Sequence, residues 1–289
     1  MREFIISTES NSDMDPAFLA ENGVCVIPHY YTIEEEMYGE DKELTVKEFY
    51  DAMRAGKKAA TMASNPAVIL ERFGEIAKQG KDILHISFSS ALSSGYNNIV
   101  NGANEIMEEY PETKIIVIDT LSASLGEGMM IQKALEMKRE GKSLEETAEW
   151  IKVNSPHINI QFTVDDLNFL YRGGRLSKSS AILGTVINIK PILYFNKEGK
   201  LVALDKVRGR KKSLATLVDN MAAQLGDYKD KQVFVGIVHG DCEEEAQNVA
   251  SMITERLGYT NIVIRPIGPS IGAHSGPGAI GVIFLGNEK

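Results

Sequence analysis

The sequence is poor in the residues that would indicate a disulfide scaffold or a metal centre. It has only two cysteines, Cys25 and Cys242, which lie far apart and have no neighbouring ligand residue. This pattern excludes a disulfide framework and a zinc site of the CxxC type, and no metal is expected. The formal net charge of −9 argues against a general binder of nucleic acids or anionic membranes.

Long apolar runs and nucleotide-binding motifs are also missing. The longest apolar runs, such as GVIFLG at 281–286, are far too short to cross a bilayer, so no stable membrane insertion is expected. The opening segment MREFIISTESNSD turns polar after one short apolar run, so no secretory signal is predicted. No G-x-x-x-x-G-K-[ST] motif occurs, which argues against a phosphoryl-transfer enzyme with its own nucleotide site. A cytoplasmic protein of bacterial type is the simplest interpretation.

In the first half of the chain, strand-like segments alternate with helix-like segments. Residues 82–88 (DILHISF) and 114–119 (KIIVID) are typical of strands in a parallel sheet. The helix expected at 97–110 carries apolar residues at the spacing of one buried face, and Ser143 with Glu146 fits a capping box. This alternation predicts βαβ crossovers and a doubly wound, mostly parallel sheet.

Beyond residue 155 the pattern changes. Residues 190–204 (KPILYFNKEGKLVAL) predict a hairpin that turns at Lys197 to Gly199. A chain of 289 residues is long for a single core, so two domains are expected. The predicted fold class is therefore α/β, with two α/β domains at 1–156 and 157–289. The second domain has a mixed sheet with helices, and the ligand lies in the cleft between the two domains.

Residues 89–95 (SSALSSG) place four serines and a glycine between a predicted strand and a predicted helix. In open α/β sheets ligands bind at the carboxyl ends of strands, where hydroxyls and free backbone N–H groups can hold an anion. A nucleophile elbow has glycine two residues either side of the serine, whereas Ser93 has Ala91 and Gly95 there. The anion site is the preferred interpretation, and a capped helix without a ligand is the alternative.

Other segments carry further candidate ligand-binding residues. Thr61, in TMASNP before a predicted helix, offers a hydroxyl to the same anion. Arg172 and Arg175 surround a glycine pair, where a guanidinium suits carboxylate or phosphate recognition, with surface ion pairing as the alternative. Arg208 belongs to the basic run KVRGRKK, either a solvated face or a docking patch. His274 lies in GPSIGAHSGPGAIG, a predicted loop suited to close backbone approach.

A serine hydrolase is the enzyme alternative. Ser93, His274 and Asp119 supply the residue types of a catalytic triad. No spacing rule links the three, and Asp119 ends a predicted strand where it can cap the following turn. The hydrolase is therefore the less favoured hypothesis.

Taken together, these segments resemble the DegV family of bacterial lipid-binding proteins. The resemblance covers essentially the whole chain and rests on the serine loop, VDDLNFLYRGGRL, KPILYFNKEGKL followed by KVRGRKK, and GAHSGPGAIG, in this order. It implies a two-domain α/β protein that holds one long-chain fatty acid in a buried tunnel, with no cofactor and no catalysis of its own.

The resemblance also implies roles for particular residues. Thr61 and Ser93 correspond to the hydroxyls that hold the carboxylate, the N–H of Ser94 would point at it, and His274 would lie nearby. Some members are the fatty-acid-binding subunits of a bacterial fatty acid kinase and carry the acyl phosphate towards an acyltransferase of phospholipid synthesis. The candidate contacts for a phosphate or the kinase are Arg172, Arg175 and Arg208.

The chain departs from the family pattern at Ala91, Ser94 and Gly95 of the serine loop. Ser94 stands in place of a glycine, which predicts a narrower carboxylate site, and Glu9-Ser10 replaces an Asp-Ser signature. A lipid-responsive regulator with the same site but no kinase partner therefore stays as a further alternative.

Overall fold

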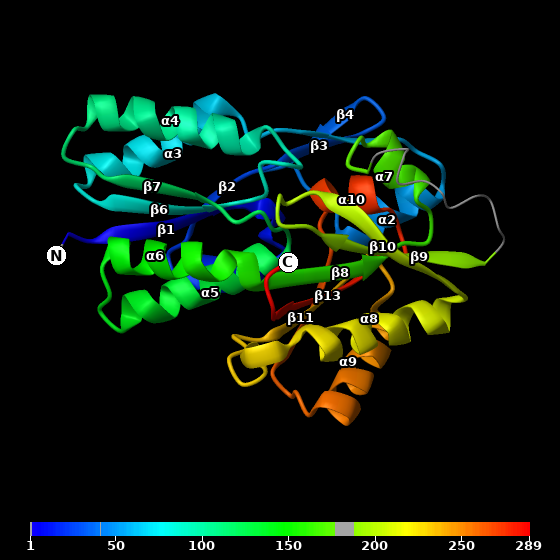
Figure 1. Ribbon diagram of the computed structural model, residues 1–289. Helices are drawn as coiled ribbons and strands as arrows, with labels where there is room; N and C mark the ends of the chain where they lie inside the picture. The colour runs from blue at the N-terminus through cyan, green and yellow to red at the C-terminus, as the bar shows by residue number, and fades with distance from the viewer. Residues whose placement is uncertain (1, 41, 177–187) are drawn as a thin grey trace.

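The computed structural model describes residues 2–40, 42–176 and 188–289. Two large β-sheets and their helices form stacked layers, and a three-stranded sheet lies at one side (Figure 1). Within the described ranges, no helix is both long enough and apolar enough to cross a membrane.

The first large sheet is entirely parallel. Its four strands follow the order β2 (Cys25–Ile27), β1 (Phe4–Glu9), β6 (Asp82–Ser87) and β7 (Ile115–Asp119). One face is covered by α3 (Pro66–Lys78) and α4 (Gly95–Glu109), and the other by α5 (Leu125–Arg139) and α6 (Leu144–Asn154) (Figure 1). This arrangement confirms the predicted doubly wound sheet. The capping box of Ser143 and Glu146 is formed at the start of α6.

The second large sheet is mixed, as predicted. Its order is β10 (Leu201–Arg208), β9 (Ile189–Phe195), β8 (Ile158–Thr163), β13 (Ile280–Leu285), β11 (Val235–His239) and β12 (Ile262–Pro266). Only β11 and β12 run parallel among these pairs. Helices α8 (Arg210–Gln224) and α9 (Glu243–Leu257) pack together on this sheet. The sheet starts just after a short 3₁₀ turn at Ser155–His157, and the domain boundary at 156/157 stays a prediction.

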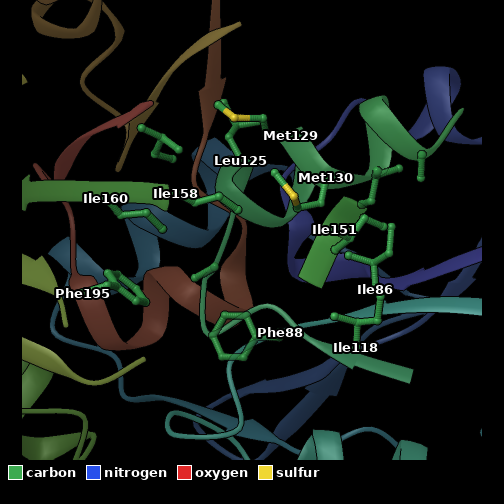
Figure 2. Packing of buried hydrophobic residues seen from close by; sticks show 14 of the residues in the cluster. Ile86, Phe88, Ile118, Leu125, Met129, Met130, Ile151, Ile158, Ile160 and Phe195 are labelled. Carbon is green, nitrogen blue, oxygen red and sulfur yellow. The ribbon is translucent and has the colours of Figure 1, made fainter. Parts of the chain in front are cut away.

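Helix α5 lies between the two large sheets and packs against strands of both. All residues from Leu125 to Ile131 are buried, as expected for a helix enclosed on every side. Figure 2 shows its side chains beside those of the first sheet and of the second sheet. The labelled side chains are Leu125, Met129 and Met130 on α5, Ile86 and Ile118 in the first sheet, and Ile158, Ile160 and Phe195 in the second sheet.

The sequence analysis missed the three-stranded sheet and one helix. This antiparallel sheet has the order β4 (Glu36–Tyr38), β3 (Tyr30–Ile33), β5 (Ala59–Met62). The prediction of a loop across 268–281 is wrong for its first half, which forms α10 (Pro269–Ser275). Proline at the first helical position permits this start, and α10 packs against β5 and α2 (Val46–Arg54). Two further short α-helices in the described residues are α1 (Pro16–Glu21) and α7 (Asn168–Arg172).

Gly102 and Gly74 provide a matched test of the α3–α4 packing. A Cβ on Gly102 would lie 2.6 Å from Cγ2 of Ile69, whereas one on Gly74 would meet only Cδ1 of Ile106 at 3.5 Å. We expect Gly102→Ala to lower the free energy of unfolding by about 1–3 kcal/mol through overpacking. Gly74→Ala should raise it by about 0.5–1 kcal/mol, because alanine favours the helix. Urea denaturation measures both, and equal stabilisation by the two alanines would contradict this packing.

Candidate functional site

Segments from both halves of the chain line a cavity of about 250 Å³. On this scale one water molecule needs roughly 10–15 Å³, so the cavity can hold a substantial ligand. Strands of the second large sheet, the ends of strands of the first and helix α10 form its walls. Most of the lining is apolar, and three of these residues are labelled in Figure 2. The large apolar side chains of the lining include Phe88, Leu92, Ile160, Phe162, Leu170, Phe195, Ile271 and Ile283.

Thr61 and His274 meet on one wall of the cavity. Thr61 belongs to β5 and His274 to α10, and Oγ1 of Thr61 lies 2.8 Å from Nε2 of His274. The other ring nitrogen, Nδ1, faces Gly173, where a Cβ would lie only 2.1 Å from it. If the Nε2–H of His274 donates to Thr61, the threonine hydroxyl remains free to donate to a ligand. The missed sheet and the missed helix therefore bring these two predicted residues together.

The serine loop joins the same site. The N–H of Gly95 donates to Oγ of Ser93 (3.1 Å), so the Ser93 hydroxyl can use its proton for a ligand. The backbone N–H of Ser94 has no hydrogen-bond partner in the described parts of the chain, and both residues line the cavity. Ser94 has φ −74°, a backbone conformation that any residue can adopt, so glycine is not needed there. Its side chain occupies the position at which the family pattern has a glycine.

Arg175 brings a positive charge to this cluster. Its Nε donates to the carbonyl of Leu92 (3.0 Å), next to Ser93, and another guanidinium nitrogen donates to Gly173. Over the residues that the structure describes, Arg175 forms no ion pair. Burial lowers its pKa, yet a guanidinium stays charged at neutral pH. An anion in the cavity would therefore find a cation that no protein carboxylate neutralises.

His274 is neutral at physiological pH. Burial and the charge of Arg175 lower its pKa to about 4. The imidazole therefore adds no charge of its own and acts as a hydrogen-bonding group.

Two predicted residues lie outside the cavity. Arg172 is the last residue of α7, is exposed and stacks on the ring of Phe169 at 4.8 Å. Arg208 is the last residue of β10 and is also exposed. Neither lines the cavity, so a role in contacting a phosphate or a partner stays a prediction.

The triad of the less favoured hydrolase hypothesis is not assembled. Nε2 of His274 bonds to Thr61, and Oγ of Ser93 accepts from Gly95. Asp119 accepts from the N–H groups of Ser90 (3.2 Å) and Leu121 (3.0 Å), which is the turn-capping role expected for it. These contacts argue against a hydrolase built on Ser93 and His274.

Among the polar cavity residues that the sequence analysis missed are Asn11, His29 and Ser124. His29 Nε2 lies 3.1 Å from Oγ of Ser64, and burial followed by the charge of His85 lowers its pKa. A signal for all three was available. They follow β1, β2 and β7 in the chain, so each lies at the carboxyl edge of the parallel sheet, where ligands are expected.

The comparisons with known proteins identify the family. Residues 3–287 match the family model described as "Uncharacterised protein, DegV family COG1307". A DegV domain-containing protein of Clostridium perfringens is 38% identical over 291 residues, which is 100% of this chain and 99% of the relative. The chain therefore belongs to the DegV family, as the sequence motifs predicted.

Solved structures agree with this assignment. A DegV family protein of Thermus thermophilus, described by its fatty acid binding, has a TM-score of 0.87 and 26% identity, covering 99% of this chain and 100% of that one. A fatty acid binding DegV family protein of Streptococcus agalactiae has a TM-score of 0.86 and 27% identity, covering 100% of both chains. These matches confirm the α/β fold with one parallel and one mixed sheet.

The pKa of His274 offers a test of the polar cluster. We expect the imidazole to titrate near its value of about 4 in the free protein, and at a higher pKa once a carboxylate binds beside it, because an anion favours the imidazolium. This folded pKa lies below the ordinary 6.5, so the folded state holds fewer protons. The contribution of His274 to stability should then fall as the pH drops from 6.5 towards 4.

Histidine NMR with and without palmitate measures this titration, and the spectrum of His274→Gln assigns the signal. A pKa that stays the same when the ligand is added would contradict an anion site next to His274.

Proposed function

We propose that this protein binds one long-chain fatty acid in the cavity. The observation that carries the proposal is the combination of an apolar cavity with hydroxyl, N–H and guanidinium donors at one wall. Thr61, Ser93 and the N–H of Ser94 hold the carboxylate, and His274 fixes the hydroxyl of Thr61. Arg175 supplies the compensating positive charge. The fatty acid binding of the Thermus and Streptococcus relatives supports the same ligand class.

The energetics favour a ligand with a long apolar chain. Burying each CH₂ group stabilises the complex by about 0.8 kcal/mol. A chain of about sixteen carbons therefore supplies on the order of 12 kcal/mol before the costs of immobilising the ligand are subtracted. The polar cluster contributes less free energy, and it orients the carboxylate. The apolar walls therefore supply most of the affinity, and the few placed donors set the orientation of the ligand.

In this proposal the protein is a cytoplasmic carrier that presents the carboxylate to a fatty acid kinase. The nucleotide belongs to the kinase, because this chain has no phosphate-binding glycine motif of its own. The product, an acyl phosphate, stays with the carrier until an acyltransferase of phospholipid synthesis accepts the acyl group. Arg172 and Arg208 are exposed cations outside the cavity, which suits contacts with a phosphate or with acidic residues of the kinase.

Lipid extraction with mass spectrometry tests the binding proposal. We expect purified protein to carry about one C14–C18 fatty acid per chain. Thr61→Ala and Ser93→Ala should each weaken palmitate binding roughly 10–150-fold, the effect of losing a hydrogen bond to a charged group. Ser90→Ala is the matched control, since Ser90 belongs to the same loop but does not line the cavity. A lipid-free protein that also fails to bind added palmitate would exclude this function.

Charge reversal tests the partner. Arg172→Glu and Arg208→Glu should leave palmitate binding intact and lower acyl-phosphate formation by the catalytic subunit of a bacterial fatty acid kinase by about tenfold or more, because rim charges govern association. Lys152→Glu serves as the control, as Lys152 is exposed on α6. Wild-type rates in both arginine variants would show that these side chains do not contact the kinase or the phosphate.

A further inference from the structure

Ser124 has an unusual backbone at the turn between β7 and α5. Its φ is 54° and its ψ −137°, in a region that residues other than glycine rarely adopt. Ser124 is the residue just before α5 and is 5% exposed. Strain of this kind persists where the surrounding structure holds it, and it concentrates at functional sites.

The turn around Ser124 has the tight geometry of a nucleophile elbow. Such an elbow presents a serine in a strained backbone conformation on a sharp strand-to-helix turn, with glycine two positions before and after it in the usual motif. Here those positions are Ser122 and Gly126, in the sequence SASLG. A Cβ on Gly126 would lie only 2.2 Å from Oγ of Ser122, so glycine is required. Both Ser93 and Ser124 therefore have only one of the two glycines, and what distinguishes Ser124 is its backbone, which has the positive φ of an elbow.

A buried carboxylate accepts the proton of Ser124. The hydroxyl of Ser124 donates to Oδ2 of Asp13. The other oxygen, Oδ1, accepts from the backbone N–H of Gly268 at 2.9 Å, which fixes the orientation of the carboxylate. Burial raises the pKa of Asp13 to about 7, against the opposing effect of these two hydrogen bonds. A base with this pKa accepts and releases protons at neutral pH.

Ser124 lines the cavity, whereas Asp13 lines a second pocket, which shares Asn11, His29 and Ser270 with the cavity. Asn11 lines the cavity as well and is 4% exposed. Its side-chain amide has no hydrogen-bond partner in the described residues, so its NH₂ group is free to donate. The N–H of Leu125, the first residue of α5, has no carbonyl within the helix to receive it. An amide and a backbone N–H are the donors that stabilise an oxyanion during acyl transfer.

We propose that Ser124 and Asp13 form a second, catalytic site in this cavity, which deacylates activated fatty acyl groups such as esters and thioesters. Oγ of Ser124 attacks the acyl carbonyl and its proton passes to Asp13. The bond to the leaving group then breaks, and an alcohol or thiol leaves with the proton from Asp13. Water next attacks the acyl-serine and gives a proton to Asp13. The acyl–Oγ bond breaks, Ser124 regains its proton and a fatty acid is released.

This activity goes beyond the carrier function and uses a different part of the cavity wall. Ser270 and His274 both line the cavity from α10, and residues four apart lie about one turn from each other on a helix. Gly268, which binds Asp13, is at the Ser270 end, and the contact with Thr61 is at the His274 end. Helix α10 thus connects the region of Asp13 and Ser124 with the donors that would hold the carboxylate of the released fatty acid.

The test uses p-nitrophenyl decanoate as the substrate. We expect the full-length protein to release p-nitrophenol in a burst of about one equivalent per chain, followed by slower turnover. Intact-mass and peptide mass spectrometry should find one decanoyl group on Ser124. Ser124→Gly suits the positive φ and should abolish the burst, and Asp13→Asn should slow acylation by about 100-fold or more. Ser122→Ala, in the same turn but outside the cavity lining, should retain the burst.

Palmitate binding, measured in parallel for every variant, reports whether the cavity is intact. A burst that persists in Ser124→Gly, a decanoyl group on Ser93 in place of Ser124, or a wild-type protein that binds palmitate but hydrolyses nothing would each overturn the proposal. If a variant loses palmitate binding together with the burst, the variant does not test the proposal. The test is then which residue of the wild-type protein carries the decanoyl group. A decanoyl group on Ser124 supports the site, and its absence refutes it.

Discussion

The architecture depends on the burial of α5 between the two large sheets. Its first residues are enclosed completely, from Leu125 to Ile131, and they contact strands of both sheets. Each sheet alone would leave an apolar face in water, and α5, with α6 beside it on the first sheet, helps to remove both faces from solvent. Because α5 starts at the carboxyl edge of the parallel sheet, the turn before it opens directly on the cavity. The element that joins the two halves therefore also fixes Ser124.

Electrostatics in this core are arranged so that the carboxylates do not all ionise. Glu9 is fully buried; burial works to raise its pKa, but the nearby imidazoles of His85 and His29 and the N–H of Phe88 lower it below its ordinary value. His85 Nε2 lies 3.3 Å from the Glu9 carboxylate, and the N–H of Phe88 donates to it at 3.1 Å. Glu127 faces the opposite situation, because burial and the charge of Glu9 raise its pKa well above the ordinary value. A neutral Glu127 beside a charged Glu9 avoids two like charges in an apolar interior.

The sequence predicted the elements whose signals are local. Strands with continuous apolar runs, such as β6, and caps such as Ser143 with Glu146 depend on neighbours in the chain, and both were found. The antiparallel sheet around β3 and the short helix α10 depend on tertiary contacts between residues far apart in the chain. For that reason the sequence did not predict them. Gly272 illustrates the difference. A Cβ there would lie 2.6 Å from Oη of Tyr50. Glycine is therefore required by a long-range contact, which the hydrophobic periodicity of the sequence does not reveal. Thr61 and His274 were identified as site residues through the resemblance of their motifs to the family. His29 and Ser124 could be identified only from the topology of the parallel sheet.

Helix α10 links the two polar regions of the cavity because separate elements hold each of its ends. The carboxylate of Asp13 binds the N–H of Gly268, and the hydroxyl of Tyr50 donates to the carbonyl of Ile267 at 3.0 Å. At the other end His274 is fixed by Thr61 and by close contact with Gly173. A helix of one or two turns has little stability of its own, so these contacts determine where it lies. Any shift of α10 would move both polar regions together, which couples the position of a bound carboxylate to the geometry around Ser124.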